Sequence, residues 1–155
     1  MKLDRDAMVR DNRQISIRME IWANRAVAQQ GLTAVQANML LYILRHSDQG
    51  TSLTAIHQEF GYSMAALSGL LKRLREKGYV RVERCEGDDR RKLLFGTEKG
   101  AQAQESLDRA ICAMQDQLYG SFTPEELRTL DRLQKKMLHN LSKSPESKSK
   151  EVSPS

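Results

Sequence analysis

The sequence has few of the residues that characterise secreted and membrane-bound proteins. Its 155 residues include two cysteines, three prolines and 5% aromatic residues. Two cysteines are too few for a disulfide framework and suit a reducing cytosol. The longest apolar run, residues 39–44, falls far short of the ~20 residues of a membrane span. The charged N-terminus lacks the apolar stretch of a signal peptide. We therefore expect a cytoplasmic protein without a membrane partner.

Motifs of catalysis and cofactor binding are also missing from the sequence. It contains no glycine-rich phosphate loop, no nucleophile elbow and no HExxH motif. The three histidines, His46, His57 and His139, are scattered and have no neighbouring ligands at metal-binding spacing. We therefore predict that the protein is not an enzyme and has no metal or cofactor site.

The composition is that of one globular, mainly helical domain. Hydrophobic residues make up 39% and charged residues 29% of the chain, which is enough to form a core without metal or disulfides. The formal net charge is +5, and residues 45–100 carry eleven basic and eight acidic side chains. This excess is compatible with an anionic partner but does not identify one.

Apolar spacing and capping signals predict six helices. Residues at about 4–30 and 98–119 repeat apolar side chains every three or four positions. Capping boxes at residues 33–36 and 123–126 begin two more helices. The first of these, ending near residue 45, is apolar nearly all round and should be buried. Two short helices are expected at about 53–59 and 64–77. Residues 142–155, rich in Ser, Lys, Pro and Glu, should be a disordered tail.

A helix-turn-helix followed by a hairpin is the informative unit. The two short helices are separated by Gly61, and after Gly78 the apolar pattern alternates over residues 79–85. A charged tip at 86–90 and a return strand at 91–97 complete a hairpin. In this arrangement the second helix can lie in a DNA major groove while the tip meets phosphates or a minor groove. Further backbone contacts are expected from Lys72, Arg73, Arg75 and Lys77.

Residues 70–100 resemble the MarR-type winged helix-turn-helix regulators. Residues 88–90, Asp-Asp-Arg, fit the family's Asp-x-Arg wing, and residues 97–100, Thr-Glu-Lys-Gly, fit the exit from the wing. The similarity extends loosely over about 15–141. It implies a mainly α fold with a small β-hairpin wing, formed by a single domain over residues 1–141. A DNA-binding lobe at about 33–97 would join a dimerisation platform of helices at about 4–30 and 98–141.

The resemblance implies a sequence-specific transcriptional regulator of double-stranded DNA. It would be a homodimeric, ligand-responsive repressor that binds a pseudo-palindromic operator. Carried over by position, the recognition helix spans residues 63–73, Arg90 is the minor-groove arginine, and Asp88 orients basic side chains, although Asp88 also fits a simple turn former. The predicted DNA-contacting residues are Ser63, Met64, Ala65, Ala66, Ser68, Gly69, Lys72, Arg73, Asp88, Arg90, Arg91 and Lys92.

Such regulators commonly respond to a small, often phenolic, effector held between the dimer platform and the DNA-binding lobe. The candidate pocket residues here are Met19, Trp22, Met39, Tyr42 and His46. Ordinary core packing also accounts for each of them.

The sequence departs from the family pattern at two places. Gly96 stands where the family usually has Leu, and we expect a looser hairpin there. The start of the recognition helix, Ser63 to Gly69, has no Arg, Asn or Gln for bidentate base reading. Gly69 costs ~1 kcal/mol relative to Ala, which a closer approach to DNA would offset. Alanine methyls can still contact thymine methyls. We expect modest direct base readout, and a larger share of recognition from DNA shape and the wing arginines.

Two other functions stay open. The small residues Ala65, Ala66 and Gly69 also fit a winged-helix protein-interaction module that does not bind DNA, although the basic run 90–92 argues against it. Cys85 stands beside Arg84, which favours a reactive thiolate and a thiol-based redox sensor. Cys112, beside Ile111, is expected in the core.

Overall fold

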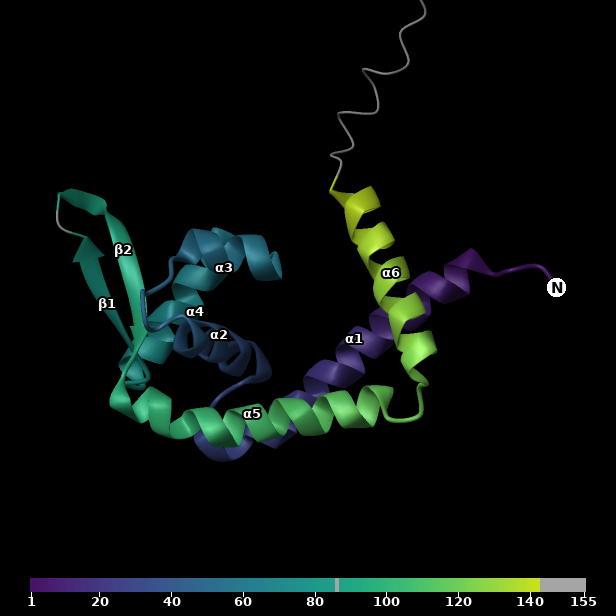
Figure 1. Ribbon diagram of the computed structural model, residues 1–155, viewed down its shortest axis with the longest axis horizontal. Coiled ribbons are helices and arrows are strands. Elements are labelled where there is room, and N and C mark those ends of the chain that lie inside the picture. The colour runs from purple at the N-terminus through teal and green to yellow at the C-terminus, as the bar shows by residue number, and fades with distance from the viewer. Residues whose placement is uncertain (86, 143–155) are drawn as a thin grey trace, which may run out of the picture. The chain divides into compact units, whose positions relative to one another are not determined.

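The computed structural model describes residues 1–85 and 87–142, and only the backbone of residues 88–90. Figure 1 shows the elements: α1 (Arg5–Val27), the short 3-10 turn η1 (Ala28–Gln30), α2 (Ala34–Arg45), α3 (Leu53–Phe60), α4 (Met64–Glu76), β1 (Val80–Cys85), β2 (Asp88–Gly96), α5 (Glu98–Tyr119) and α6 (Pro124–Leu141). The predicted fold class, mainly α with one hairpin, is confirmed. The predicted disordered tail lies, beyond Ser142, outside the described residues.

The chain divides into two compact units. Met1–Met114 holds α1 to β2 and most of α5, and Gln115–Ser155 holds the end of α5 and α6. None of the helices in the described part of the chain is long and apolar enough to cross a membrane.

Capping side chains set the helix starts. Thr33 and Thr123 accept hydrogen bonds from the N–H groups of Gln36 and Glu126, at 3.2 and 3.1 Å. The side chains of Gln36 and Glu126 accept in return from the threonine N–H groups. Both predicted capping boxes are confirmed, and each satisfies donors that the first helical turn leaves free.

The core of the first unit is built around α2, as its all-round apolar sequence predicts. Met39, Leu40, Leu41 and Ile43 are at most 1% exposed. Three leucines of α4 pack into the same cluster, namely Leu67, Leu71 and Leu74. Helix α4 is therefore held along one face, and this fixes the orientation of its other face.

The hairpin is joined to the lobe by a bridge that the sequence does not predict. Strands β1 and β2 pair antiparallel, from Val80 opposite Gly96 to Arg84 opposite Lys92. Thr51 adds a third, one-residue strand, because its N–H and C=O exchange hydrogen bonds with Leu94 at 3.1 and 2.7 Å. A single residue has no periodicity, so only the folded structure shows this connection.

The return strand is longer than predicted. Strand β2 begins at Asp88, three residues before the expected Arg91, because Cys85 already pairs with Asp88. Gly87 adopts a φ of 85°, which a glycine tolerates without steric cost. The backbone of residues 88–90 thus belongs to a strand rather than to a loop, with an irregular register after Arg84.

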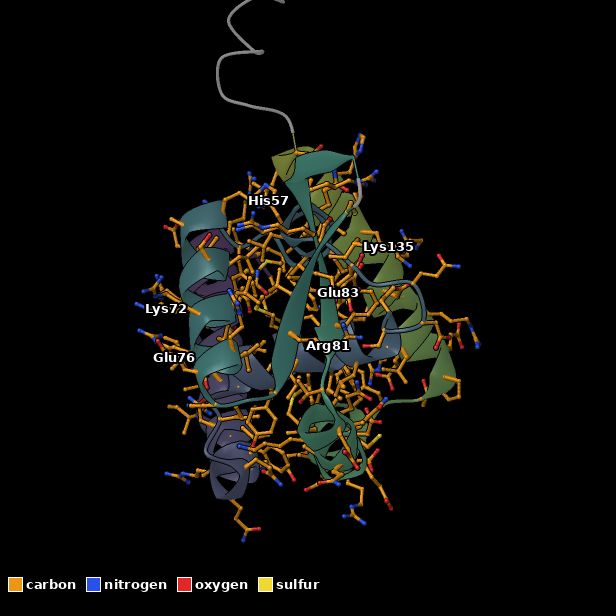
Figure 2. All side chains as sticks on the ribbon, turned by 90° about the vertical axis from the view of Figure 1, so that its left-hand side faces the viewer. His57, Lys72, Glu76, Arg81, Glu83 and Lys135 are labelled. Atoms are coloured by element: carbon orange, nitrogen blue, oxygen red, sulfur yellow. The ribbon has the colours of Figure 1, made fainter. Side chains whose placement is uncertain are left out.

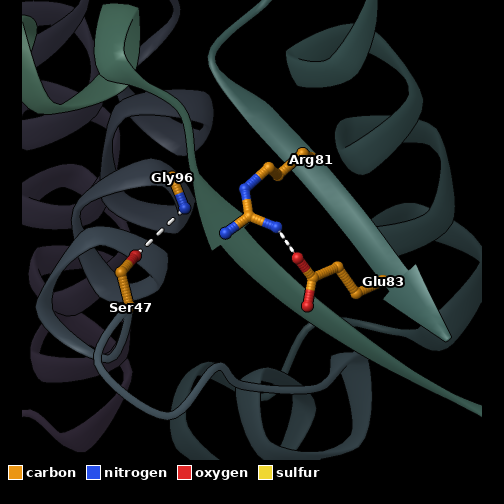
Figure 3. A network of polar contacts seen from close by, with 4 residues as sticks. All are labelled: Ser47, Arg81, Glu83 and Gly96. Carbon is orange, nitrogen blue, oxygen red and sulfur yellow. Dashed lines mark hydrogen bonds and ion pairs between the residues drawn. The ribbon is translucent and has the colours of Figure 1, made fainter. Parts of the chain in front are cut away.

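The expectation that Gly96 loosens the hairpin is wrong. A Cβ at this position would collide with Cδ2 of Leu44, so the α2 side chain already occupies the space. The Gly96 N–H donates to Ser47 Oγ at 3.0 Å, as Figure 3 shows. The Ser47 hydroxyl in turn donates to the Ile43 carbonyl at 2.8 Å. Glycine allows helix and strand to approach closely here, and the exit of the wing is firmly held.

Candidate nucleic-acid interface

The predicted helix-turn-helix is present in α3, its turn and α4. Gly61 ends α3 with a φ of 76° and donates its N–H to the His57 carbonyl at 2.8 Å. The His57 ring donates from Nδ1 to the Tyr62 carbonyl across the turn. Ser63 then caps α4 by accepting from the Ala66 N–H at 3.1 Å. The turn and the cap together set the direction in which α4 begins.

Helix α4 has one buried and one open face. Its three buried leucines leave the predicted DNA-contacting residues of this helix exposed: Ser63, Met64, Ala65, Ala66, Ser68, Gly69, Lys72 and Arg73. A Cβ built on Gly69 would meet no atom within 4 Å. Figure 2 shows Lys72 and Glu76 pointing outward from α4. The open face therefore has no packing role within the described part of the chain.

A groove of about 530 Å³ lies between α4 and the wing. Lys72 and Arg75 from α4 and Lys92 from β2 supply three cations to its lining, and Glu76 supplies one anion. The other lining residues are Leu53, Ser68 and Leu71. Cations that converge from two elements match the needs of a polyanionic backbone. The lining role of Glu76 and Leu53 was not predicted, although Glu76 stands four residues from Lys72 on the same helical face.

The expectation that Lys77 is a free backbone contact is wrong. Its ammonium group donates to the Gly31 carbonyl at 2.5 Å and to Gln36 Oε1 at 3.1 Å. Nearby, the Tyr79 hydroxyl donates to the Gln30 carbonyl at 2.9 Å. These bonds tie the end of α4 to the corner between α1 and α2. Lys77, which follows the last residue of α4, is therefore a structural lysine, in contrast to the exposed Lys72 on the helix itself.

The wing presents part of its predicted basic surface. Arg91 and Lys92 are exposed on β2, while the side chains of Asp88 and Arg90 lie outside the described part of the structure. At the base of the wing, the Arg81 guanidinium pairs with Glu83, as Figure 3 shows. It also lies 4.6 Å from the centroid of the Phe95 ring. Arg81 therefore stabilises the hairpin.

A second cavity, of about 380 Å³, is lined by α1, α2, α5 and the turn that precedes α4. Its lining residues are Ser16, Met19, Glu20, Ala23, Ala34, Val35, Asn38, Tyr62 and Met114. Of the five predicted pocket residues, Met19 lines this cavity. Met39 is 1% exposed in the core. Tyr42 stacks on His46 with ring centroids 4.1 Å apart, and Trp22 is half-buried on α1. Trp22, Met39, Tyr42 and His46 are not among the lining residues of this cavity.

The polar groups of this cavity are Ser16, Glu20, Asn38 and Tyr62, and Glu20 is its charged side chain. Burial raises the pKa of the Tyr62 phenol above its ordinary value of 10.0, and the Glu20 carboxylate raises it further. The phenol therefore stays protonated at neutral pH and can donate a hydrogen bond.

The two cysteines occupy different environments. Cys85 is half-buried at the end of β1, and Cys112 is exposed on α5. The core placement of Cys112 is wrong, because Leu107, Ala110 and Ile111 form the inward stripe and the next residue turns away from it. In the part of the chain that the structure describes, no group of three His, Cys, Asp or Glu side chains could hold a metal ion.

Comparisons with known proteins identify the relatives of this chain. The structure of Staphylococcus aureus MepR in complex with DNA is similar, with a TM-score of 0.77 and 25% identity, over 83% of this chain and 92% of MepR. Residues 30–91, which include α2 to α4 and β1, match the model of the MarR family. Over these 62 of its 155 residues, the chain is similar to the MarR family. The resemblance seen in residues 70–100 is confirmed.

Further solved structures of MarR-type regulators have the same fold. A cysteine-to-serine mutant of Escherichia coli MarR in complex with operator DNA has a TM-score of 0.75 and 23% identity, over 85% of this chain and 94% of that one. A regulator from Listeria monocytogenes, complexed with a 26mer DNA, has a TM-score of 0.79 and 23% identity, over 91% and 90% of the two chains. At these identities the likeness establishes the architecture of this protein, including its winged lobe.

Proposed function

We propose that this protein is a DNA-binding transcriptional regulator and not an enzyme. The observation that carries the proposal is the groove between α4 and the wing, where Lys72, Arg75 and Lys92 converge beside the open face of α4. The DNA complexes of MepR and MarR support it. A regulator of chromosomal genes acts where the chromosome lies, and we infer a cytoplasmic location.

Each part of the interface has a role in this proposal. The first turns of α4 enter the major groove, and the groove cations contact the phosphates on either side of it. Arg91 and Lys92 extend the phosphate contacts along β2. Arg90 reaches the adjacent minor groove, with Asp88 orienting the basic side chains.

We further propose that the active form is a homodimer and a repressor. Ile15 on α1 and Met137 and Leu141 on α6 are 47%, 44% and 81% exposed, and such apolar surface favours a covering partner. In this arrangement residues 33–97 form the DNA-binding lobe, and the helices at 4–30 and 98–141 form the platform. A two-fold dimer would read a pseudo-palindromic operator with half-sites about 10 bp apart.

The cavity beside Met19, Glu20 and Tyr62 supports response to a small-molecule effector. Its lining joins α1 and α5 to the turn that leads into α4. An effector bound there would contact the platform and the turn before the recognition helix at once, and so could bias the position of α4.

Lys72 on α4 and Lys77 directly after it provide a matched test of DNA binding. Lys72→Met should weaken binding to a labelled random 26-bp duplex and lower the log–log salt slope by about one, because one ionic interaction with a phosphate is removed. The free energy of unfolding should stay unchanged, since Lys72 is exposed. Fluorescence anisotropy at several salt concentrations and urea denaturation measure the two quantities.

Lys77→Met is the control for the removal of a charge. It should lower the free energy of unfolding by about 1–3 kcal/mol, because its bonds to Gly31 and Gln36 disappear, and should leave the salt slope unchanged. A wild-type protein that binds no duplex DNA would contradict the proposal and favour a protein-interaction module. If Cys85→Ser abolished an oxidant response of DNA binding, the thiol sensor would be the better description.

A further inference from the structure

The open face at the start of α4 is apolar, although it lies in a basic lobe. Met64 is 43% exposed, and Ala65, Ala66 and Gly69 are exposed beside it. Among the described residues from 22 to 121, the exposed large apolar side chains are Phe60 and Met64. Phe60 packs against the rings of Tyr42 and Tyr62.

The polar groups on these two turns are few. Ser63 Oγ accepts the capping hydrogen bond from the Ala66 N–H, so one of its two acceptor sites is already engaged. Ser68 carries a second hydroxyl and lines the groove toward the wing. The first long polar side chain on this face is Lys72. Within the described residues, the N-terminal half of α4 therefore offers far more methyl and methylene surface than hydrogen-bonding groups.

The DNA major groove presents one apolar group to a helix. Each base pair displays hydrogen-bond donors and acceptors there, and thymine alone adds a C5-methyl group. The residues of a recognition helix that contact base edges are those of its N-terminal turns. On this chain those turns carry Met64 and Ala65, while cations from Lys72, Arg75 and Lys92 stand beside them to hold the phosphates.

We propose that α4 selects its target by contacts between the side chains of Met64 and Ala65 and the C5-methyl groups of thymine. This inference rests on the proposed DNA-binding function and adds the chemistry of base recognition. The target duplex should be rich in thymine at the positions that face Met64 and Ala65 in each half-site. The cations of the groove supply affinity for any duplex, and the methyl contacts supply the preference for one sequence.

Replacing thymine by deoxyuridine tests this recognition, because the change removes the methyl group and keeps every base-pairing atom. Duplexes selected from a random 26-bp pool by the wild-type protein are synthesised in both forms and titrated by fluorescence anisotropy. Removing one thymine methyl that faces α4 should weaken binding about fourfold, which corresponds to about 0.8 kcal/mol per buried carbon. The salt slope should not change, since no charge is altered.

Two variants test whether Met64 is responsible for the preference for thymine. Met64→Ala should weaken binding to the thymine duplex and reduce the ratio of the two affinities toward one, with the same thermal unfolding midpoint because Met64 is exposed. Lys72→Met should weaken binding to both duplexes equally and keep the ratio.

Three results would count against the inference, in distinguishable ways. Equal affinity for the thymine and deoxyuridine duplexes would overturn methyl recognition while leaving DNA binding intact. An unchanged ratio in Met64→Ala would overturn the role of Met64. Absence of binding to every duplex would instead overturn the proposed function on which the inference rests.

Discussion

Gly69 stands in the middle of α4 without a packing reason for being glycine. Its backbone is helical, and a methyl group there would meet no neighbouring atom. A glycine inside a helix costs about 1 kcal/mol relative to alanine. Gly69 therefore lowers the stability of the folded monomer without improving its packing. Any benefit of glycine here would come from a molecule that approaches the helix from outside.

Gly69→Ala should raise the free energy of unfolding by about 1 kcal/mol and weaken binding to selected duplex DNA. The added methyl fits the free protein but stands on the face that would meet the major groove. Urea denaturation and anisotropy measure the two effects. Ser68→Ala is the control, because it removes an oxygen from the preceding residue without adding an atom. Tighter duplex binding by Gly69→Ala would show that DNA does not approach this position.

Tyr62 gives the cavity a measurable titration. Because burial and Glu20 raise its pKa above 10.0, the folded state holds the phenolic proton more tightly than the unfolded state. This contribution to stability is complete below pH 10.0 and is lost as pH rises through the folded pKa.

The ultraviolet titration of the four tyrosines should therefore contain one component with a midpoint above 10.0. Tyr62→Phe should remove that component, and Glu20→Gln should move it to lower pH, because one negative charge is gone. If Tyr62→Phe leaves the high-pH component in place, another tyrosine is responsible.

At the scale of elements, the junction of α2 with the wing depends on complementary volumes. The Leu44 side chain fills the space beside Gly96, and the Ser47 hydroxyl accepts a hydrogen bond from the Gly96 N–H. Thr51, at the far end of the loop that follows α2, pairs with Leu94 of the same strand, β2. The wing is thus fixed to the core of the lobe through α2 and the loop after it.

A double-mutant cycle tests this junction. Gly96→Ala should lower the free energy of unfolding by about 1–3 kcal/mol, because the new methyl overlaps Leu44. Leu44→Ala alone should also destabilise the fold by leaving a void. The double variant should lose less free energy of unfolding than the sum of the two single variants, because the methyl added at position 96 would occupy part of the void left at position 44. Urea denaturation gives the four free energies, and strict additivity would contradict the described packing.

The elements themselves could be predicted from sequence because their signals are local. The threonines of the capping boxes, the stripe of Leu67, Leu71 and Leu74, and the alternation after Gly78 each depend on neighbours a few residues away. The bridge from Thr51 to Leu94 and the bond from Lys77 to Gly31 join distant segments, and no spacing encodes them. The same limit applies to the cavity: Met19 was predicted, but its neighbour Tyr62 comes from another part of the chain.

At the scale of the whole molecule, apolar side chains remain exposed on the terminal helices. Ile15, Ile17 and Ile21 of α1 are between 46% and 48% exposed, and Leu138 of α6 is 68% exposed. On α6, Met137 and Leu141 are 44% and 81% exposed as well, and exposed apolar side chains gathered on one helix favour a covering partner.

The protein should therefore sediment as a dimer at micromolar concentration. Leu138→Glu should shift the equilibrium toward monomer, because a carboxylate in an apolar interface loses its hydration. Lys136→Glu, which places the same carboxylate at an exposed polar position of the same helix, is the control and should stay dimeric. Sedimentation velocity measures both, and a stable wild-type monomer would refute the expectation.

The division of α4 into two faces has an evolutionary consequence. Leu67, Leu71 and Leu74 attach the helix to the core, whereas Met64, Ala65, Ser68 and Gly69 have no folding task that would restrict their replacement. A duplicated copy of this gene could therefore acquire a new operator by changing these four positions, without a compensating change in the core. The same freedom makes them the positions to randomise when the protein is retargeted by laboratory selection.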